Sequence, residues 1–369
     1  MVAQPTNDRP GKSQVRRAAE QLCDKFAATG ADRFEADILF PAEVLLDLYG
    51  EDIRARAYVT SDPAQGEMML RPDFTVPVVQ YHMDRNETPA RYTYFGEVFR
   101  KQEDHPDRRS EFMQVGYELF GGGDAALADA EVFSVFAETL KPLNLHAVTG
   151  DIGILIAMVS NLRVSDARRA ALMRHIWRPA RFTSLVKRFA GVIPTPPSRK
   201  ALLERSDPMA DAGPMVGLRG ESEIVSRIAA LRADAEDTPM CGEDVDLISA
   251  VLSVAETCPN ALGRLRDIAV DLPGINPALS KFEARCEALT RRGVDVETLR
   301  FEASHGRSSM EYYDGFVFGF YADARPDLPP VATGGRYDAL THRLGHGRAI
   351  PAVGGVIRPD LVLALGGTV

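Results

Sequence analysis

The sequence predicts an α+β fold in which a mostly antiparallel sheet is flanked by helices and receives an α-helical insertion. Alternating apolar and polar runs, typical of strands, occur up to residue 153 and again after residue 300. Between residues 154 and 299 strand patterns nearly vanish, and short helical segments rich in Ala, Leu and Arg are separated by Pro and Gly. We therefore expect one domain from residues 10–153 and 300–369, a helical insertion domain at 154–299, and a flexible N-terminus at 1–9.

The composition is that of a globular protein. The chain has 369 residues, of which 45% are hydrophobic and 26% are charged, enough for two or three domains with cores of their own. The net charge of −9 provides no global attraction for nucleic acid or anionic membranes. Four Cys without CxxC spacing predict reduced thiols, and the N-terminal residues lack the apolar core of a signal peptide. With no 18-residue apolar run, the expected location is the cytoplasm.

The elements before residue 90 follow from periodicity and capping residues. Apolar residues at helical spacing between Ser13 and Gly30 predict a helix with Ser13 as its N-cap and Gly30 as its end. The sequence then predicts a strand at 34–41, a helix at 42–50, a strand at 68–71, and a helix from about Thr75 that Asp73 or Thr75 caps.

The next two strands form a predicted hairpin. Residues 91–100 and 111–120 both alternate, and the charged segment 101–110 joins them. The remaining elements are a helix at 124–143 opened by Asp124, a strand at 146–153, strands at 311–322 and 331–340, and a strand-to-helix passage at 351–367.

One face of the second hairpin strand has an unusual composition. It carries Gln114, Gly116 and Glu118 between two Phe, and a Gly inside a strand indicates close approach of another group. Gln114 and Glu118 lie about 13 Å apart at about 3.3 Å per residue, a distance that an amino acid with a polar side chain could span through hydrogen bonds. Arg100 ends the neighbouring strand. The face is therefore either the floor of a pocket or a polar ladder on the surface of the sheet.

Common catalytic and cofactor signatures are missing from the sequence. There is no GxxxxGK[ST] or GxGxxG motif, no arguable Ser, His and Asp triad, and no carboxylate or Cys pattern beside His342 and His346. We expect no catalytic residue, metal or cofactor.

Five segments, in order, resemble the signatures of the histidyl-tRNA synthetase catalytic domain, a class II aminoacyl-tRNA synthetase fold. They are MMLRPDFT, RYTYFGEVFRK with RRSEFMQVGYELFG, MEYYDGFVF, ATGGRYDAL and PAVGGVI. The resemblance covers about residues 10–150 and 300–365, and RFEADILFP falls where that class has its dimer-forming motif.

The resemblance implies a site for L-histidine. Asp73, Thr75 and Gln114 fall on the residues that hold the α-amino group, Glu118 on the acid that reads the imidazole, and Tyr313 with Tyr312 on the residues lining the ring. The full set that we expect to bind histidine is Asp73, Thr75, Arg100, Arg108, Gln114, Glu118, Tyr312, Tyr313 and Tyr337.

Several positions depart from the synthetase pattern. Ser308 and Leu361 stand where the synthetase has Arg residues that assist activation and hold ATP, Gln102 replaces a Glu, and no anticodon-binding domain is expected. Loss of such cations removes stabilisation that adenylation needs.

These departures resemble the family of ATP phosphoribosyltransferase regulatory subunits, for which LRPDFT is the typical form. That family implies a non-catalytic, histidine-binding chain under allosteric feedback in histidine biosynthesis. It also implies dimers of this chain and a hetero-octamer of four such chains with four short-form catalytic subunits, without tRNA or membrane. The alternatives are a divergent or truncated histidyl-tRNA synthetase and a free-standing histidine-binding module.

Overall fold

The structure is a computed structural model that describes residues 10–49, 51–85, 87–102, 108–210, 212–217, 219–307 and 312–367. The N-terminus at 1–9, expected to be flexible, lies outside these residues, as does the middle of the charged hairpin segment, residues 103–107.

A nine-stranded sheet forms the centre of the described chain, in the order β1-β5-β6-β12-β11-β10-β7-β9-β8. Its strands are β1 (Asp32–Arg33), β5 (Ala90–Phe99), β6 (Glu111–Phe120), β7 (His146–Asp151), β8 (Ala255–Thr257), β9 (Arg300–Glu302), β10 (Phe316–Tyr321), β11 (Ala332–Arg336) and β12 (Ala352–Ile357). The strands from β5 to β7 pair antiparallel, while β1 joins β5 and β9 joins β7 in parallel. The predicted hairpin is confirmed, and its register places Tyr94 opposite Gly116.

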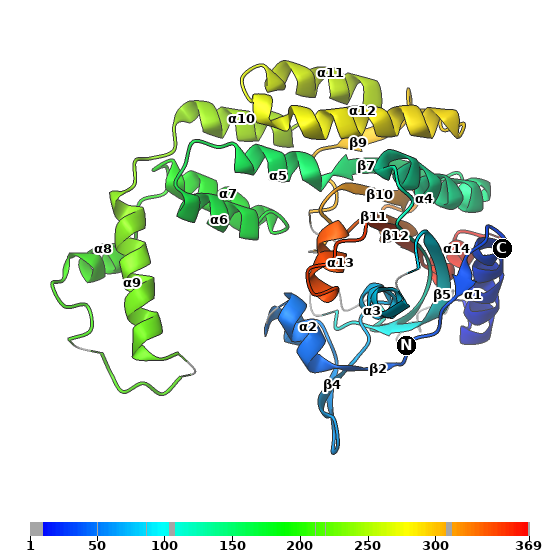
Figure 1. The fold of residues 1–369 in the computed structure, drawn as a ribbon, viewed down its shortest axis with the longest axis horizontal. Helices are drawn as coiled ribbons and strands as arrows, with labels where there is room; N and C mark the ends of the chain where they lie inside the picture. The colour runs from blue at the N-terminus through cyan, green and yellow to red at the C-terminus, as the bar shows by residue number, and fades with distance from the viewer. Residues whose placement is uncertain are drawn as a thin grey trace, which may run out of the picture.

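Helices α1 (Lys12–Ala27) and α4 (Ala125–Leu140) cover one face of this sheet (Figure 1). The α1 residue Phe26 packs edge-on against Tyr117 of β6, with 5.5 Å between ring centroids. Asp124 caps α4 as predicted, because its carboxylate accepts hydrogen bonds from the backbone N–H groups of Ala126 and Leu127. The apolar face of β6 is thus buried in the main core.

The opposite face of the sheet carries α3 (Thr75–Arg85). Phe74, just before α3, stacks on Tyr94 at 4.4 Å, and His82 in α3 stacks on Phe120 at 4.1 Å. Near α3 lie α13 (Asp338–Leu344), α2 (Ala42–Tyr49), the 3-10 helix η1 (Glu51–Ala55) and a small sheet of β2 (Leu39–Pro41), β4 (Gly66–Leu70) and β3 (Val59–Asp62). This arrangement leaves the carboxyl end of β5 and the amino end of β6 open toward the N-terminus of α3.

The expected strand at 34–41 forms only in part. Its last three residues make β2, but the guanidinium of Arg71 donates hydrogen bonds to the backbone carbonyls of Ala36 and Asp37. These carbonyls are therefore taken by a side chain instead of a strand partner. The short strand β3 was not predicted.

In the described part of the segment expected as a helical insertion, all regular elements are helices apart from β8, which extends the main sheet at one edge. Its helices are α5 (Ile152–Ser160), α6 (Asp166–Arg174), α7 (Pro179–Phe189), α8 (Pro197–Glu204), α9 (Glu221–Glu236), α10 (Gly242–Leu252), α11 (Cys258–Ala269) and α12 (Asn276–Arg291). Helix α12 packs along α4, so this part of the segment shares the core of the sheet. Helices α8 and α9 stand away from the rest of the molecule (Figure 1).

Three short elements complete the description: η2 (Lys141–Leu143), η3 (Pro273–Ile275) and the C-terminal helix α14 (Pro359–Ala364). Among the helices of the described residues, none combines the length and apolar character needed to cross a membrane.

Candidate ligand-binding site

A cavity of about 640 Å³ lies over the face of β6 that the sequence singled out. All nine residues expected to bind histidine line it, from β6, the start of α3, the end of β5 and the segments before β10 and after β11. Because Gln114 and Glu118 are both buried, this face of β6 is the floor of a pocket and not a polar ladder on the surface of the sheet. Which ligand these residues hold is addressed below as a proposal.

Glu118 occupies the inner end of the cavity. Its carboxylate accepts hydrogen bonds from the hydroxyls of Tyr94, at 2.7 Å, and Tyr337, at 2.6 Å. Burial raises the pKa of Glu118 to about 7, and the hydrogen bonds from the two hydroxyls offset only part of this rise. A carboxylate held by two hydroxyl donors keeps lone pairs that can accept a hydrogen bond from a ligand N–H.

Two glycines make room for this arrangement. A Cβ on Gly116 would lie 2.0 Å from the ring of Tyr94, which explains why a glycine stands in the middle of β6. A Cβ on Gly354 of β12 would lie 1.5 Å from Oε2 of Glu118. The predicted close approach at Gly116 is therefore confirmed, and the approaching group is a side chain of the neighbouring strand.

Gln114 lies four residues from Glu118 on the same face. Its Oε1 atom is buried and has no hydrogen-bond partner among the described residues. A buried acceptor without a partner costs free energy and is normally satisfied by a ligand or water. Gln114 thus offers an acceptor to a donor group inside the cavity.

The N-terminus of α3 supplies two further polar groups. Oδ1 of Asp73 accepts a hydrogen bond from the backbone N–H of Thr75, at 3.2 Å, and the Thr75 hydroxyl lies 3.2 Å from that of Tyr312. Burial raises the pKa of Asp73, and the nearby Arg100 partly offsets this effect. Together with Gln114, these oxygens form a cluster of acceptors suited to an ammonium group.

Aromatic rings enclose the cavity between the two ends. The rings of Tyr312 and Tyr313 meet edge-on at 4.9 Å, and those of Tyr312 and Tyr337 at 5.9 Å. The indole N–H of Trp177 donates to the backbone carbonyl of Tyr313 at 3.0 Å, which fixes the main chain there. A flat, partly apolar ring fits between such walls.

Cationic side chains gather where the cavity meets β5. Arg100 donates a hydrogen bond from Nε to the carbonyl of Pro72 at 2.7 Å, and Arg108 and Arg358 also line this end. Burial, together with the charges of Arg100 and Arg108, lowers the pKa of Arg358 to about 10. This end of the cavity attracts an anionic group.

Arg358 is a cation of the cavity that sequence reasoning did not place there. The cation expected of a synthetase was taken to be lost because Leu361 occupies its place, and Leu361 is indeed buried and apolar. Arg358, three residues earlier, nevertheless brings a guanidinium to the cavity. The other substituted position, Ser308, lies outside the described residues, as do residues 309–311.

Sequence reasoning also missed Tyr94, which shapes the inner end of the site. The signal was present, because pairing the two hairpin strands symmetrically about their loop sets Tyr94 opposite Gly116. A large side chain directly opposite a glycine can lie over that glycine on the same face of the sheet, as the ring of Tyr94 does.

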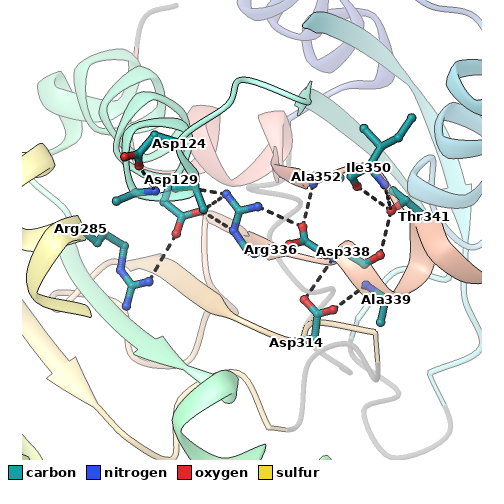
Figure 2. A network of polar contacts seen from close by, with 12 residues as sticks. Asp124, Asp129, Arg285, Asp314, Arg336, Asp338, Ala339, Thr341, Ile350 and Ala352 are labelled. Carbon is teal, nitrogen blue, oxygen red and sulfur yellow. Dashed lines mark hydrogen bonds and ion pairs between the residues drawn. The ribbon is translucent and has the colours of Figure 1, made fainter. Parts of the chain in front are cut away.

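A network of buried ion pairs and hydrogen bonds fixes the residues next to the cavity tyrosines Tyr313 and Tyr337 (Figure 2). Arg336, which precedes Tyr337, donates to Asp129 of α4 at 2.7 Å and 2.9 Å, and Arg285 of α12 lies 3.4 Å from the same carboxylate. Asp314, which follows Tyr313, accepts hydrogen bonds from the backbone N–H groups of Asp338 and Ala339. The chain on both sides of the cavity tyrosines is thus fixed by charged groups.

The residues that the structure describes contain no group of three or more His, Cys, Asp or Glu arranged to hold a metal ion.

Comparisons with known proteins agree with this picture. The family model described as histidyl-tRNA synthetase matches residues 9–205 and 225–362. An ATP phosphoribosyltransferase regulatory subunit of Agrobacterium fabrum is 33% identical over 95% of this chain and 97% of its own length, and one of Brucella anthropi is 32% identical over 88% and 90%.

Solved structures share the fold. A crystal structure described as an ATP phosphoribosyltransferase regulatory subunit/histidyl-tRNA synthetase from Bacillus halodurans covers 100% of this chain and 84% of its own, with a TM-score of 0.68 and 22% identity. The histidyl-tRNA synthetase of Nostoc matches 99% of this chain and 75% of its own, with a TM-score of 0.64 and 16% identity. These matches confirm the predicted synthetase-like sheet flanked by helices.

Proposed function

The chain belongs to the family of ATP phosphoribosyltransferase regulatory subunits, which is built on the histidyl-tRNA synthetase fold, and we propose that its cavity binds L-histidine to regulate a catalytic partner. The observation that supports this proposal best is the pair Gln114 and Glu118 on one buried strand face. Oε1 of Gln114 has no hydrogen-bond partner among the described residues, and two hydroxyls hold the carboxylate of Glu118.

In the proposed complex the ligand lies along β6. Its ammonium group donates to Gln114, Asp73 and Thr75, and its imidazole donates an N–H to Glu118. Tyr312, Tyr313 and Tyr337 surround the ring, and Arg100, with Arg108 and Arg358 nearby, faces the carboxylate. Each polar group of histidine then meets a complementary group, as a buried ligand requires.

We assign the chain a regulatory, non-catalytic role in the first step of histidine biosynthesis. The names of its relatives support this role. In the proposed assembly, the chain forms dimers and joins short-form catalytic subunits in a cytoplasmic hetero-octamer of four plus four, without tRNA. Histidine inhibits by binding one state of this assembly more tightly than another, and the inhibition is no larger than that difference in affinity.

The test is an assay of phosphoribosyl transfer to ATP by the short-form catalytic subunit with and without this chain. We expect this chain to confer inhibition by L-histidine. With Glu118→Gln the histidine concentration needed for inhibition should rise about 10- to 150-fold, because a charge-assisted hydrogen bond is lost. The matched control is Glu97→Gln, since Glu97 lies on the neighbouring strand β5 and pairs with the exposed Arg16.

Two outcomes would contradict the proposal. Unchanged inhibition in Glu118→Gln would remove Glu118 from the histidine site. Histidine-dependent exchange of pyrophosphate into ATP by the chain alone would support a synthetase instead.

A further inference from the structure

The helical segment contains a strongly cationic stretch. Residues 167–203 include nine Lys and Arg and no Asp or Glu, in a chain whose net charge is −9. Arg168, Arg169, Arg188 and Lys200 have acidic partners within the chain, so only some of these cations can meet an oppositely charged partner.

A groove of about 430 Å³ lies within this stretch. On one side is a stripe of α7 at helical spacing that includes Arg181, Leu185 and Arg188, and on the other is the segment around Ile193 that leads to Arg199 in α8. None of the residues lining the groove is acidic. The groove is thus lined by apolar and cationic residues.

Two of the three arginines that line the groove are available to a partner. Arg181 and Arg199 form no ion pair with any residue of the described ranges, and Nε of Arg188 is buried without a hydrogen-bond partner there. Arg188 forms a long ion pair with Asp234, at 3.9 Å. Charges left without partners inside the chain can pair with those of another molecule.

Apolar side chains beside the groove are exposed to solvent. Val192 and Ile193 are 69% and 41% exposed, α8 buries none of its residues, and the 16-residue helix α9 buries only Ile228. Most helical stability in proteins comes from packing, so this part of the molecule has little core of its own. Exposed apolar groups next to cations fit a protein partner better than a nucleic acid, whose phosphates need only charge.

We propose that this groove is the docking site for an acidic segment, with apolar side chains, of the catalytic partner. The inference rests on the regulatory function proposed above. A second copy of this chain fits the groove less well. In a two-fold symmetric dimer formed through the groove, the two cationic surfaces would face each other, and a head-to-tail contact would build an open chain of subunits instead of a closed dimer.

The test is a calorimetric titration of the catalytic subunit with the full chain that carries Arg181→Glu and Arg199→Glu. The titration is made at low and at moderate salt. We expect affinity for the catalytic subunit to fall about 10- to 100-fold, and the wild-type affinity to weaken as salt rises. The control, Arg17→Glu with Arg291→Glu, makes the same charge change at exposed positions of α1 and α12 and should bind as the wild type does. Ile193→Ser should weaken binding at both salt concentrations.

Histidine binding, measured on the same variants, separates this inference from the proposed function. If the double variant binds the catalytic subunit as tightly as the control does, the groove is not the docking site, and the histidine-binding function stands. If the wild-type chain does not bind the catalytic subunit, both the partnership and the docking site fail. If the double variant instead loses binding to a short fluorescent RNA duplex while keeping the catalytic subunit, the groove is a nucleic-acid surface and the inference is wrong.

Discussion

At the scale of single residues, the candidate site depends on an acid held in a costly environment. Glu118 is almost fully buried, and no cationic side chain is hydrogen-bonded to it in the described structure; only the hydroxyls of Tyr94 and Tyr337 donate to its carboxylate. Burial without a paired cation destabilises the charged form, which is why the pKa of Glu118 rises to about 7. A residue kept at this cost is more consistent with ligand binding than with stability.

This cost predicts how stability depends on pH. Between about pH 4.5 and 7 the folded chain keeps a proton on Glu118 that the unfolded chain has lost, so the contribution of Glu118 to stability decreases as pH rises through this window. Glu118→Gln removes the titrating group. We expect the variant to exceed the wild type in free energy of unfolding by about 3 kcal/mol at pH 8 and by much less at pH 5.

Urea denaturation of both proteins at the two pH values measures this difference. A variant that is less stable than the wild type at pH 8 would show that Glu118 is ionised without penalty, and the raised pKa would then be wrong.

At the scale of secondary-structure elements, the site lies where β5, β6 and β12 meet the N-terminus of α3. The hairpin of β5 and β6 could be predicted because its alternation is strong over 10 residues in each strand. The helix starting at Thr75 was predictable from its capping residue. These two elements carry most of the site.

Other elements left no clear pattern in the sequence. Strand β3, Val59–Asp62, is mostly exposed, and β8 has three residues within a helical region, so neither shows a period of two. The role of Arg358 depends on where the end of β12 lies relative to β6, which is a long-range contact. Local sequence patterns therefore predict the β6 face of the cavity. They do not predict its cationic end, because that end depends on which strands are neighbours in the sheet.

The packing of β12 on β6 predicts the effect of a small substitution. Gly354→Ala would place a Cβ 1.5 Å from the Glu118 carboxylate, so either the strand or the acid must move. We expect this variant to lose stability by about 1–3 kcal/mol and to lose ligand binding.

The matched control is Gly263→Ala in α11, where nothing lies within 4 Å of an added Cβ. It should raise stability by about 0.5–1 kcal/mol because Gly is unfavourable inside a helix. Thermal unfolding of the two variants gives the comparison, and equal stability of Gly354→Ala and the wild type would mean that the strand contact is looser than described.

At the scale of the whole molecule, buried charges connect the sheet to the helical segment. Asp129 of α4 meets Arg336 of β11 and Arg285 of α12, and Arg285 also donates to Asp151 at 2.7 Å (Figure 2 shows the contacts around Asp129). All four side chains are buried, and Arg336 also pairs with the partly exposed Asp338 at 3.0 Å. The network thereby joins elements that are more than 100 residues apart in the sequence.

Removing one charge should unbalance the network. In Asp129→Asn, Arg336 keeps only its ion pair with the partly exposed Asp338, and Arg285 keeps only that with Asp151. Breaking a buried pair in this way commonly costs about 3–5 kcal/mol. The control, Glu283→Gln, removes an exposed ion pair with Arg266 and should change stability by less than about 1 kcal/mol. Urea denaturation distinguishes the two, and a similarly small loss in both variants would show that the network does not hold the helical segment to the sheet.

The most direct measurement of the central claim is calorimetric titration of L-histidine into the purified chain, the Glu118→Gln variant and the Glu97→Gln control. We predict one histidine per chain for the wild type and the control, and an affinity about 10- to 150-fold weaker for Glu118→Gln, which remains folded. Absence of binding to the wild-type chain, or equal affinity in wild type and Glu118→Gln, would contradict the account.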